Sequence, residues 1–194
     1  MNTPKDLVYI DEYGLLGSNY YWYKYETHGI TKGDILQAGL TNERVQVSKS
    51  IIDILVSIDQ DFQKNGYRLY IKEGHRSEDL YNIVYKRRVA KFGKEVTDTI
   101  LNIKDMPHSS GLAVDIALWD KETNKEIYLR RKEDGVPAFF VHFYQGREDS
   151  ESRGYQDLQD YTIGVMMRYG FRLGSKREYF HFNYQLDLPE NYDE

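Results

Sequence analysis

The sequence contains no cysteine, only four prolines, and no apolar run long enough to span a bilayer. Without cysteine there are no disulfides, and any metal ion must be held by histidine and carboxylate side chains. The N-terminal stretch MNTPKDLVYIDEYG lacks both the basic and the apolar region of a secretory signal. We therefore expect a cytoplasmic protein with no membrane segment, unless it is released by lysis or exported without a signal.

The chain also lacks an excess of basic residues. It carries 31 Asp and Glu against 26 Lys and Arg, a formal charge of -5, which argues against nucleic-acid binding through general phosphate attraction. The densest basic run lies in a predicted helix, where a solvated face is the simpler interpretation; it consists of Lys86, Arg87, Arg88, Lys91 and Lys94. Tyrosine is abundant, with 18 residues, and four of them surround Trp22. For this cluster we expect a half-buried edge or surface rather than a carbohydrate platform.

No repeat, low-complexity block or linker divides the 194 residues, so the chain is interpreted as one domain, 1–194. The segment 1–40 is aromatic and turn-rich, and we expect irregular structure with short strands packed on the core. The remaining elements follow from apolar spacing and from cap and turn residues. The sequence predicts helices over 41–65, after Ser77 and over 157–169; strands over 67–72, 112–118, 127–129 and 179–184; a hairpin turn over 120–126; and loops over 102–110 and 145–156.

The stretch PHSSGLAVDI, residues 107–116, places His108 in a turn seven positions before Asp115. Alternation in the following strand puts its large apolar residues on one side and leaves Ala113, Asp115 and Ala117 on the other. The acid therefore lies between two methyl-sized neighbours. This leaves room beside the carboxylate for something larger than a side chain.

A second stretch, EYFHF, sets Glu178 three residues before His181. Together with His108 and Asp115 they make two imidazoles, one ligating carboxylate and one further carboxylate, the inventory of a hydrolytic zinc site whose open position holds water. A net positive ion lowers the pKa of that water to about 7, and the second carboxylate takes the proton. Because residues three apart in a strand face opposite sides, Glu178 must precede the strand or lie at a bulge. The alternative for Glu178 is a surface acid paired with a neighbouring base.

These residues resemble a known family. His108 to Asp115 matches the pattern HxxGxAxD and Glu178 to His181 matches ExxH, the motifs of the zinc D-alanyl-D-alanine peptidases, which include the D-alanyl-D-alanine dipeptidases of vancomycin resistance. The stretch EGHR around Arg76 is similar to DGYR of those dipeptidases. The resemblance extends from about Tyr67 to Tyr184. It implies the hedgehog/DD-peptidase fold, an α+β single domain with a central, mainly antiparallel sheet and flanking helices.

The resemblance also implies roles. His108, Asp115 and His181 would bind one zinc ion per chain, Glu178 would act as general base and then as acid, and Arg76 would polarise the scissile carbonyl. A guanidinium suits that last role because it stays charged and meets charge that develops in the transition state.

Further expectations concern neighbours of these residues. Gly111 would let the loop turn closely past the metal. Ser109, Ser110 and His75 are candidate substrate contacts, although a serine in a turn has ordinary structural uses. His28 and His142 are expected to be structural or surface residues. A His2Asp set would also accept other divalent ions.

Three departures from the family pattern bear on the substrate. Met106 stands where a serine is common, Phe180 stands where a tryptophan is common, and the region around Phe140 lacks the acids that recognise a free amino group. The nearest acids to that region are Glu148 and Asp149.

Three functions follow as hypotheses. The first is zinc-dependent hydrolysis of the D-Ala-D-Ala dipeptide by a metal-activated water, in the cytoplasm. The second is a carboxypeptidase or endopeptidase acting on peptidoglycan stem peptides, including a phage-type lytic enzyme. The third is a zinc-stabilised binding module without turnover. The expected partner is a small peptide that contains D-alanine, with no nucleic acid and no membrane, and the oligomeric state stays open.

Overall fold

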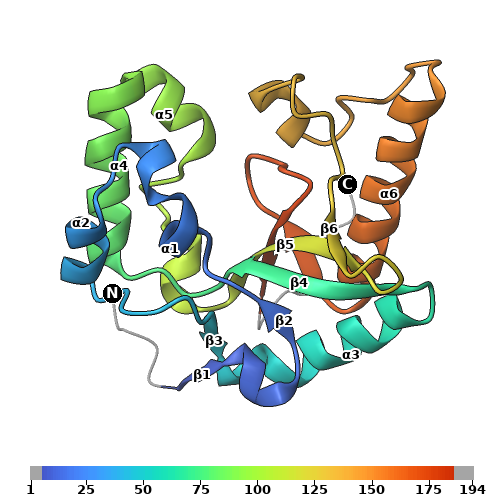
Figure 1. Ribbon diagram of the computed structural model, residues 1–194, viewed down its shortest axis with the longest axis horizontal. Coiled ribbons are helices and arrows are strands. Elements are labelled where there is room, and N and C mark those ends of the chain that lie inside the picture. The colour runs from blue at the N-terminus through green and yellow to red at the C-terminus, as the bar shows by residue number, and fades with distance from the viewer. Residues whose placement is uncertain (1–5, 186–194) are drawn as a thin grey trace.

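The computed structural model describes residues 6–185, which form a mixed sheet with helices on its faces (Figure 1). The strands are β1 (Leu7–Tyr9), β2 (Leu16–Gly17), β3 (Gln46–Ser48), β4 (Tyr67–Glu73), β5 (Ala113–Asp120), β6 (Lys125–Ile127), β7 (Phe171–Leu173) and β8 (His181–Tyr184). The α-helices are α1 (Tyr20–Lys24), α2 (Lys32–Gln37), α3 (Ile52–Gln63), α4 (Glu78–Phe92), α5 (Lys94–Ile100) and α6 (Ser150–Arg168). Short 3-10 helices are η1 (Ile10–Tyr13), η2 (Tyr25–His28), η3 (Lys49–Ile51), η4 (Pro107–Ser110) and η5 (Val136–Phe139).

The central sheet has six strands in the order β2-β4-β5-β8-β7, and β6 pairs with β5. Only the short β2–β4 pair is parallel, and all other pairs in this sheet are antiparallel. A separate antiparallel pair joins β1 to β3. The predicted α+β class with a mainly antiparallel sheet is thereby confirmed.

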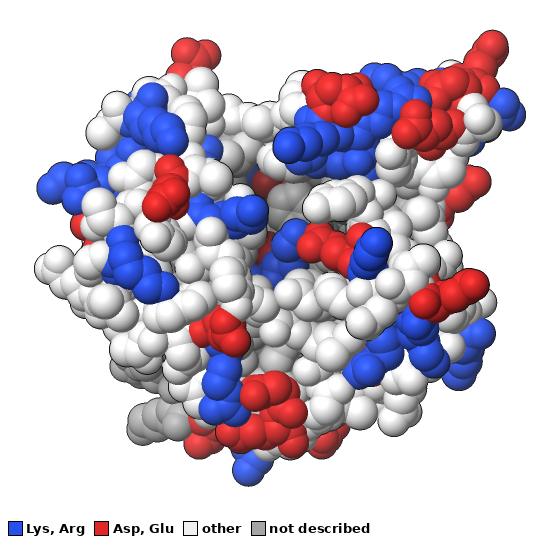
Figure 2. All heavy atoms as spheres, viewed as in Figure 1, with Lys and Arg blue, Asp and Glu red and all other residues white. Residues whose placement is uncertain are grey.

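One face of the sheet packs against α3 and α6, which lie below and to the right of it in Figure 1. From β5 this core receives Val114, Ile116 and Leu118, all buried, as the alternation predicts. A second apolar cluster joins α1, α2 and α4 on the other side of the molecule, with Tyr81 and Val84 among its fully buried residues. The fold thus has two apolar clusters, and the space-filling view shows the surface hollowed between the corresponding halves (Figure 2).

Two helix starts differ from the prediction. Helix α3 begins at Ile52 rather than near residue 41, because Val47 lies in β3 and Val45 directly precedes it, and both are buried with the spacing of a strand. Helix α6 begins at Ser150, inside the predicted loop 145–156. The Asp149 carboxylate accepts a hydrogen bond from the Ser152 backbone N–H and caps this helix, whose polar first turns mask the apolar period.

The basic run was predicted as a solvated face of one helix, and four of its five residues are exposed, but it does not lie on one helix and Arg88 is buried. Helix α4 ends at Phe92, Gly93 adopts a φ of +85°, and α5 begins at Lys94, so the run is shared between two helices. Within α4, Arg88 is buried, whereas Lys86 and Arg87 are exposed. The predicted cap is confirmed, since the Ser77 hydroxyl accepts from the Leu80 N–H at 3.2 Å. No helix in residues 6–185 combines the length and the apolar character needed to cross a bilayer.

Gly111 joins η4 to β5 and lies close to the backbone of β3, so a substitution at Gly111 measures how tightly these segments are packed. Its φ is +72°, and a Cβ added there would lie 2.8 Å from the Ser48 backbone nitrogen. We expect Gly111→Ala to lower the free energy of unfolding by about 2–4 kcal/mol, since a left-handed alanine costs about 1 kcal/mol and the clash with backbone adds to it. Urea unfolding measures this change.

Gly39→Ala is the matched control, because Gly39 has a φ of +85° but open space around its position. The control isolates the backbone strain and should cost only about 1 kcal/mol. Equal losses in the two variants would show that the close approach to β3 has no energetic weight.

Candidate metal centre and active site

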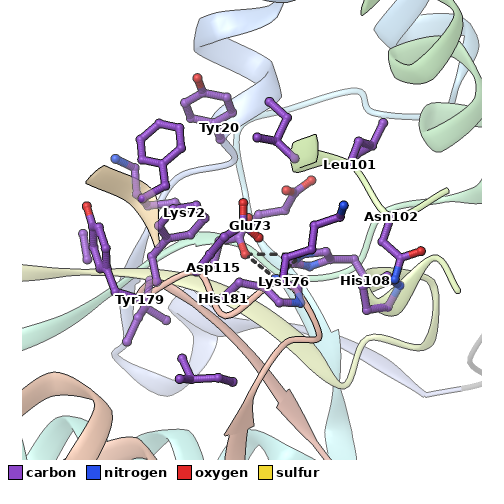
Figure 3. Close-up of a pocket in the computed structure, with 18 of the residues that line it drawn as sticks. Tyr20, Lys72, Glu73, Leu101, Asn102, His108, Asp115, Lys176, Tyr179 and His181 are labelled. Atoms are coloured by element: carbon purple, nitrogen blue, oxygen red, sulfur yellow. Dashed lines mark hydrogen bonds and ion pairs between the residues drawn. The ribbon is translucent and has the colours of Figure 1, made fainter. Parts of the chain in front are cut away.

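Three candidate ligands meet at the upper face of the central strands (Figure 3). The Nδ1 atom of His181 lies 2.7 Å from Asp115 Oδ1 and 3.2 Å from His108 Nε2, and the third side, His108 Nε2 to Asp115 Oδ1, is 3.4 Å. Asp115 on β5 and His181 on β8 are direct cross-strand partners, which is why their side chains share a face. His108 reaches them from η4. The structure therefore brings the three predicted ligands together.

The triangle of donor atoms fits a zinc ion. Ligand atoms about 2.0–2.2 Å from a tetrahedral ion lie about 3.3–3.6 Å from one another, so two sides match and the 2.7 Å side must open by about half an ångström. The second ring nitrogen of His108 supports the same assignment, because Nδ1 donates to the Gly74 carbonyl at 2.8 Å. That hydrogen bond leaves the Nε2 lone pair facing the site, as metal-ligating histidines require.

The electrostatics of the three groups also favour a cation. Burial alone would raise the pKa of Asp115, but the adjacent imidazoles of His108 and His181 hold that pKa well below its usual range. Burial acts to lower the pKa of His108, and the Asp115 carboxylate outweighs it, so the pKa of His108 is raised. Both directions mean that the site keeps its carboxylate ionised and stabilises positive charge beside it.

Glu178 lies beside this centre but outside the ligand triangle. It precedes β8 and forms an isolated antiparallel bridge with Phe140, flanked by a hydrogen bond from the Tyr179 N–H to the Phe139 carbonyl. The residue thus precedes the strand, as the spacing of EYFHF requires. Only 8% of it is exposed, and burial together with the charge of Asp115 raises the pKa of Glu178 to about 7. A carboxyl group with this pKa exchanges a proton readily near neutral pH.

Arg76 is buried in the same cavity and is held by Glu73. Its Nε donates to Glu73 Oε1 at 2.7 Å, its Nη2 donates to Glu73 Oε2, and the guanidinium lies against the rings of Tyr21 and Tyr81. Burial opposes the charge, but Glu73 raises the pKa of Arg76 well above its ordinary value. The backbone N–H of Arg76 donates to the His108 carbonyl at 3.1 Å. Arg76 and the loop that carries His108 are therefore positioned together.

Glu73 was missed by the sequence analysis. Alternation along β4 places it with Leu69 and Ile71 on the core face. A register shift between Ile71 and Glu73 instead brings Glu73 opposite Asp115 on the site face. Bulges re-aim side chains in this way next to functional sites. An acid three residues before Arg76 was the available signal.

A cavity of about 630 Å³ opens over the centre, and both halves of the molecule contribute to it. Its lining includes the three ligands, Glu178, Arg76 and Glu73, together with further polar residues that the sequence did not mark as part of a site. They include Lys72, Arg88, Asn102, Asp105, Glu126, Arg130, Lys176 and Asn183. Among them, Lys72 donates to Glu126 at 2.6 Å and Asn102 donates to Asp105 at 2.7 Å.

The three residues predicted to contact substrate, His75, Ser109 and Ser110, lie outside this cavity lining in the described part of the chain. The Ser110 hydroxyl donates to the Pro107 carbonyl at 3.1 Å and accepts from the Leu112 N–H at 3.2 Å, which is a turn-forming arrangement. Asp149 is used as the α6 cap and pairs with Arg131.

No family model matches the sequence. No curated protein matches it either. Among solved structures, the fold is similar to that of the LD-carboxypeptidase LdcB, described for peptidoglycan recognition, at 19% identity and a TM-score of 0.48, covering 72% of this chain and 59% of that one.

Two vancomycin-resistance enzymes are also similar. One is a mutant of the D,D-pentapeptidase VanY in complex with Zn(II), at 15% identity and a TM-score of 0.47, with 72% of each chain covered. The other is the D,D-dipeptidase VanXYg with a D-Ala-D-Ala phosphinate analog, at 17% identity and a TM-score of 0.45, covering 92% of this chain and 66% of that one. The present chain thus spans less than two thirds of the LdcB and VanXYg chains.

Gly174 packs directly on the imidazole of His181, and a Cβ there would lie 2.2 Å from His181 Cδ2. We expect Gly174→Ala to tilt this ring out of the triangle and to weaken metal binding about 10- to 100-fold, the loss that follows when a ligand's supporting contacts are changed. Competition with a chelating dye measures the affinity. The control is Gly164→Ala in α6, where an added Cβ meets nothing within 4 Å. Unchanged affinity in Gly174→Ala would mean that His181 is not a ligand.

The raised pKa of Glu178 predicts a pH-dependent stability in metal-free protein. A carboxyl whose folded-state pKa is about 7 stabilises the fold fully below its unfolded value of 4.5, and this contribution is lost as pH rises through about 7. Glu178→Gln should therefore match the original protein near pH 4 and exceed it at pH 8.5 by an amount on the order of 2 kcal/mol. Urea unfolding with a chelator at the two pH values measures this. A gain that is the same at both would contradict the assignment.

Proposed function

We propose that the chain is a zinc-dependent peptidase that hydrolyses a peptide bond in a small substrate containing D-alanine. The observation that carries the proposal is the convergence, within one cavity, of a His2Asp ligand triangle, a buried carboxyl with a pKa of about 7 and a buried arginine. A hydrolytic metal site needs these components, and a non-catalytic module has no use for the last two. The motifs that resemble the zinc D-alanyl-D-alanine peptidases supply the substrate class.

The residues divide the work as follows. His108, Asp115 and His181 hold one zinc ion, which supplies Lewis acidity at the cavity floor when bound. A Glu178 carboxylate oxygen accepts the proton of the attacking water and returns it to the leaving amine. Its burial keeps the pKa of Glu178 near the value that serves both steps.

Arg76 stabilises the negative charge that develops on the carbonyl oxygen. Glu73 occupies Nε and one N–H of Nη2, so the Nη1 group and the second N–H of Nη2 are left to donate to the substrate. The pairing with Glu73 and the two tyrosine rings fix the direction of those donors before the substrate arrives. Preorganised donors of this kind contribute about 3–4 kcal/mol to transition-state stabilisation.

Two substrates are compatible with this centre. The first is the free D-Ala-D-Ala dipeptide, whose amino terminus would bind Glu126 or Asp105 of the cavity lining in place of their present partners, Lys72 and Asn102. The second is a longer peptidoglycan stem peptide, and the cavity volume of about 630 Å³, in the range of ligands larger than a dipeptide, favours it.

Assays on three substrates separate these functions: the D,D-dipeptide, a D,D-pentapeptide and an L,D-linked stem peptide. Cleavage of the dipeptide but not of the pentapeptide supports the dipeptidase, and the reverse supports the stem-peptide enzyme. Removal of zinc with a chelator should abolish either activity, and re-addition of zinc should restore it. Absence of any zinc-dependent cleavage would overturn the peptidase proposal.

Glu178→Gln tests the role of the base. We expect kcat to fall about 10²- to 10⁴-fold, because general acid–base catalysis contributes this much, while zinc content stays near one ion per chain. Glu122→Gln, in the exposed β5–β6 turn, is the control. His181→Ala should lose both activity and metal. Activity that survives in Glu178→Gln would show that another group moves the proton.

A further inference from the structure

The cavity contains a buried cation that the mechanism above does not use. Arg88 on α4 is 7% exposed and belongs to the lining. In residues 6–185 no Asp or Glu lies within ion-pair distance of it, and its Nε has no hydrogen-bond partner. Leaving a buried charge without a counter-ion costs several kcal/mol, so arginines in this state are rare away from functional sites.

Arg88 contacts the ring of Phe92, 5.1 Å from its Cζ, and the side chain of His28, at the end of η2. Arg88 Nη1 lies within hydrogen-bond distance of His28 Nδ1, which must accept because a guanidinium only donates. Burial and the charge of Arg88 lower the pKa of His28 to about 3, so the ring is neutral and its proton is on Nε2. His28 Nε2 is itself buried without a partner.

Three carboxylates of the cavity wall already have partners in the described structure. Glu73 is taken by Arg76 in a two-point pair, Glu126 accepts from Lys72 and Asp105 accepts from Asn102. Tyr20 and Tyr21 close the wall beside His28, with ring centroids 5.4 and 5.3 Å from its ring. A guanidinium that lines the cavity and has no counter-ion describes a place for a small planar anion.

We propose that Arg88 and His28 form a subsite of this cavity that binds a carboxylate of the peptide substrate. The guanidinium of Arg88 supplies the hydrogen bonds, His28 holds that guanidinium through Nη1, and the anion supplies the missing counter-charge. The assignment of the anion to a peptide rests on the peptidase function proposed above. The carboxylate has two possible sources, the C-terminus of the peptide or an acidic residue within it.

The side-chain Nε–H resonance of Arg88 tests the subsite directly, without turnover. Zinc-loaded Glu178→Gln protein labelled with ¹⁵N is titrated with three ligands: acetyl-D-Ala-D-Ala, its C-terminal amide, and an amidated peptide whose only carboxylate is on a glutamate. A shift caused by the first ligand identifies the terminal carboxylate, and a shift caused by the third identifies an internal one. The amide should leave the resonance unchanged. Equal shifts from all three ligands, or none, would overturn the proposal.

Kinetics provide a second test. In Arg88→Gln, KM for the carboxylate substrate should rise about 10- to 100-fold with a smaller change in kcat, and cleavage of the matching amide should be unaffected, since only a charge-assisted contact is lost. Arg88→Lys keeps the charge and should lie between the two. Lys86→Gln removes one charge from the exposed face of the same helix and should behave like the original protein. Equal losses on acid and amide would indicate a structural role and overturn the proposal.

The two proposals fail in distinguishable ways. If no peptide is cleaved but the Arg88 resonance responds only to carboxylates, the peptidase function is wrong and the anion subsite stands. If cleavage is zinc-dependent but acid and amide bind alike, the subsite is wrong and the peptidase function stands.

Discussion

The register of β5 between β4 and β8 is the constraint on which the centre depends. It places Asp115 opposite His181 on one side and opposite Glu73 on the other, so three polar side chains from three strands form one row on one face. A slip of one residue in either pairing would turn Asp115 into the apolar core and replace it by Val114 or Ile116. The apolar residues on the opposite face therefore fix the position of the candidate metal ligand.

Buried charge is unusually concentrated around this row. Asp115 is balanced by two imidazoles, Glu73 by Arg76, and Glu178 by a raised pKa rather than by a partner. Each way of balancing the charge has a different chemical consequence. The imidazoles around Asp115 make a cation site, the Glu73–Arg76 pair makes a rigid hydrogen-bond donor, and Glu178 can carry a proton. Arg88 is balanced by none of these means, which is why we assign its counter-ion to the substrate.

Small residues make the space that these groups share. Ala113 and Ala117 flank Asp115 on β5, and Gly174 packs on the His181 ring, so these three positions add no bulk beside the ligands. The walls come from the two halves of the molecule, with α1 and α4 on one side and the segment around Phe139 on the other (Figure 1). A site between two separately packed clusters combines a rigid floor with walls that accept insertions and substitutions.

The resemblance to the zinc D-alanyl-D-alanine peptidases implied the α+β class and the roles of the site residues, whereas the sequence by itself determined the secondary elements with strong apolar periods and the candidate inventory of two histidines and two acids. These follow from short patterns, because neighbours in a strand or turn have directions that local geometry dictates. It did not reveal the start of α6, which depends on the Asp149 cap, nor the split of the basic run at Gly93.

Only the tertiary structure decided which charged side chains turn inward. Glu73 reaches the site through a bulge that alternation along β4 does not anticipate, and Arg88 is buried because α4 packs against η2 and His28. Both facts depend on contacts between segments far apart in the chain. A sequence pattern gives the spacing of residues along the chain. Whether a charged side chain is buried depends on which distant segment packs against it.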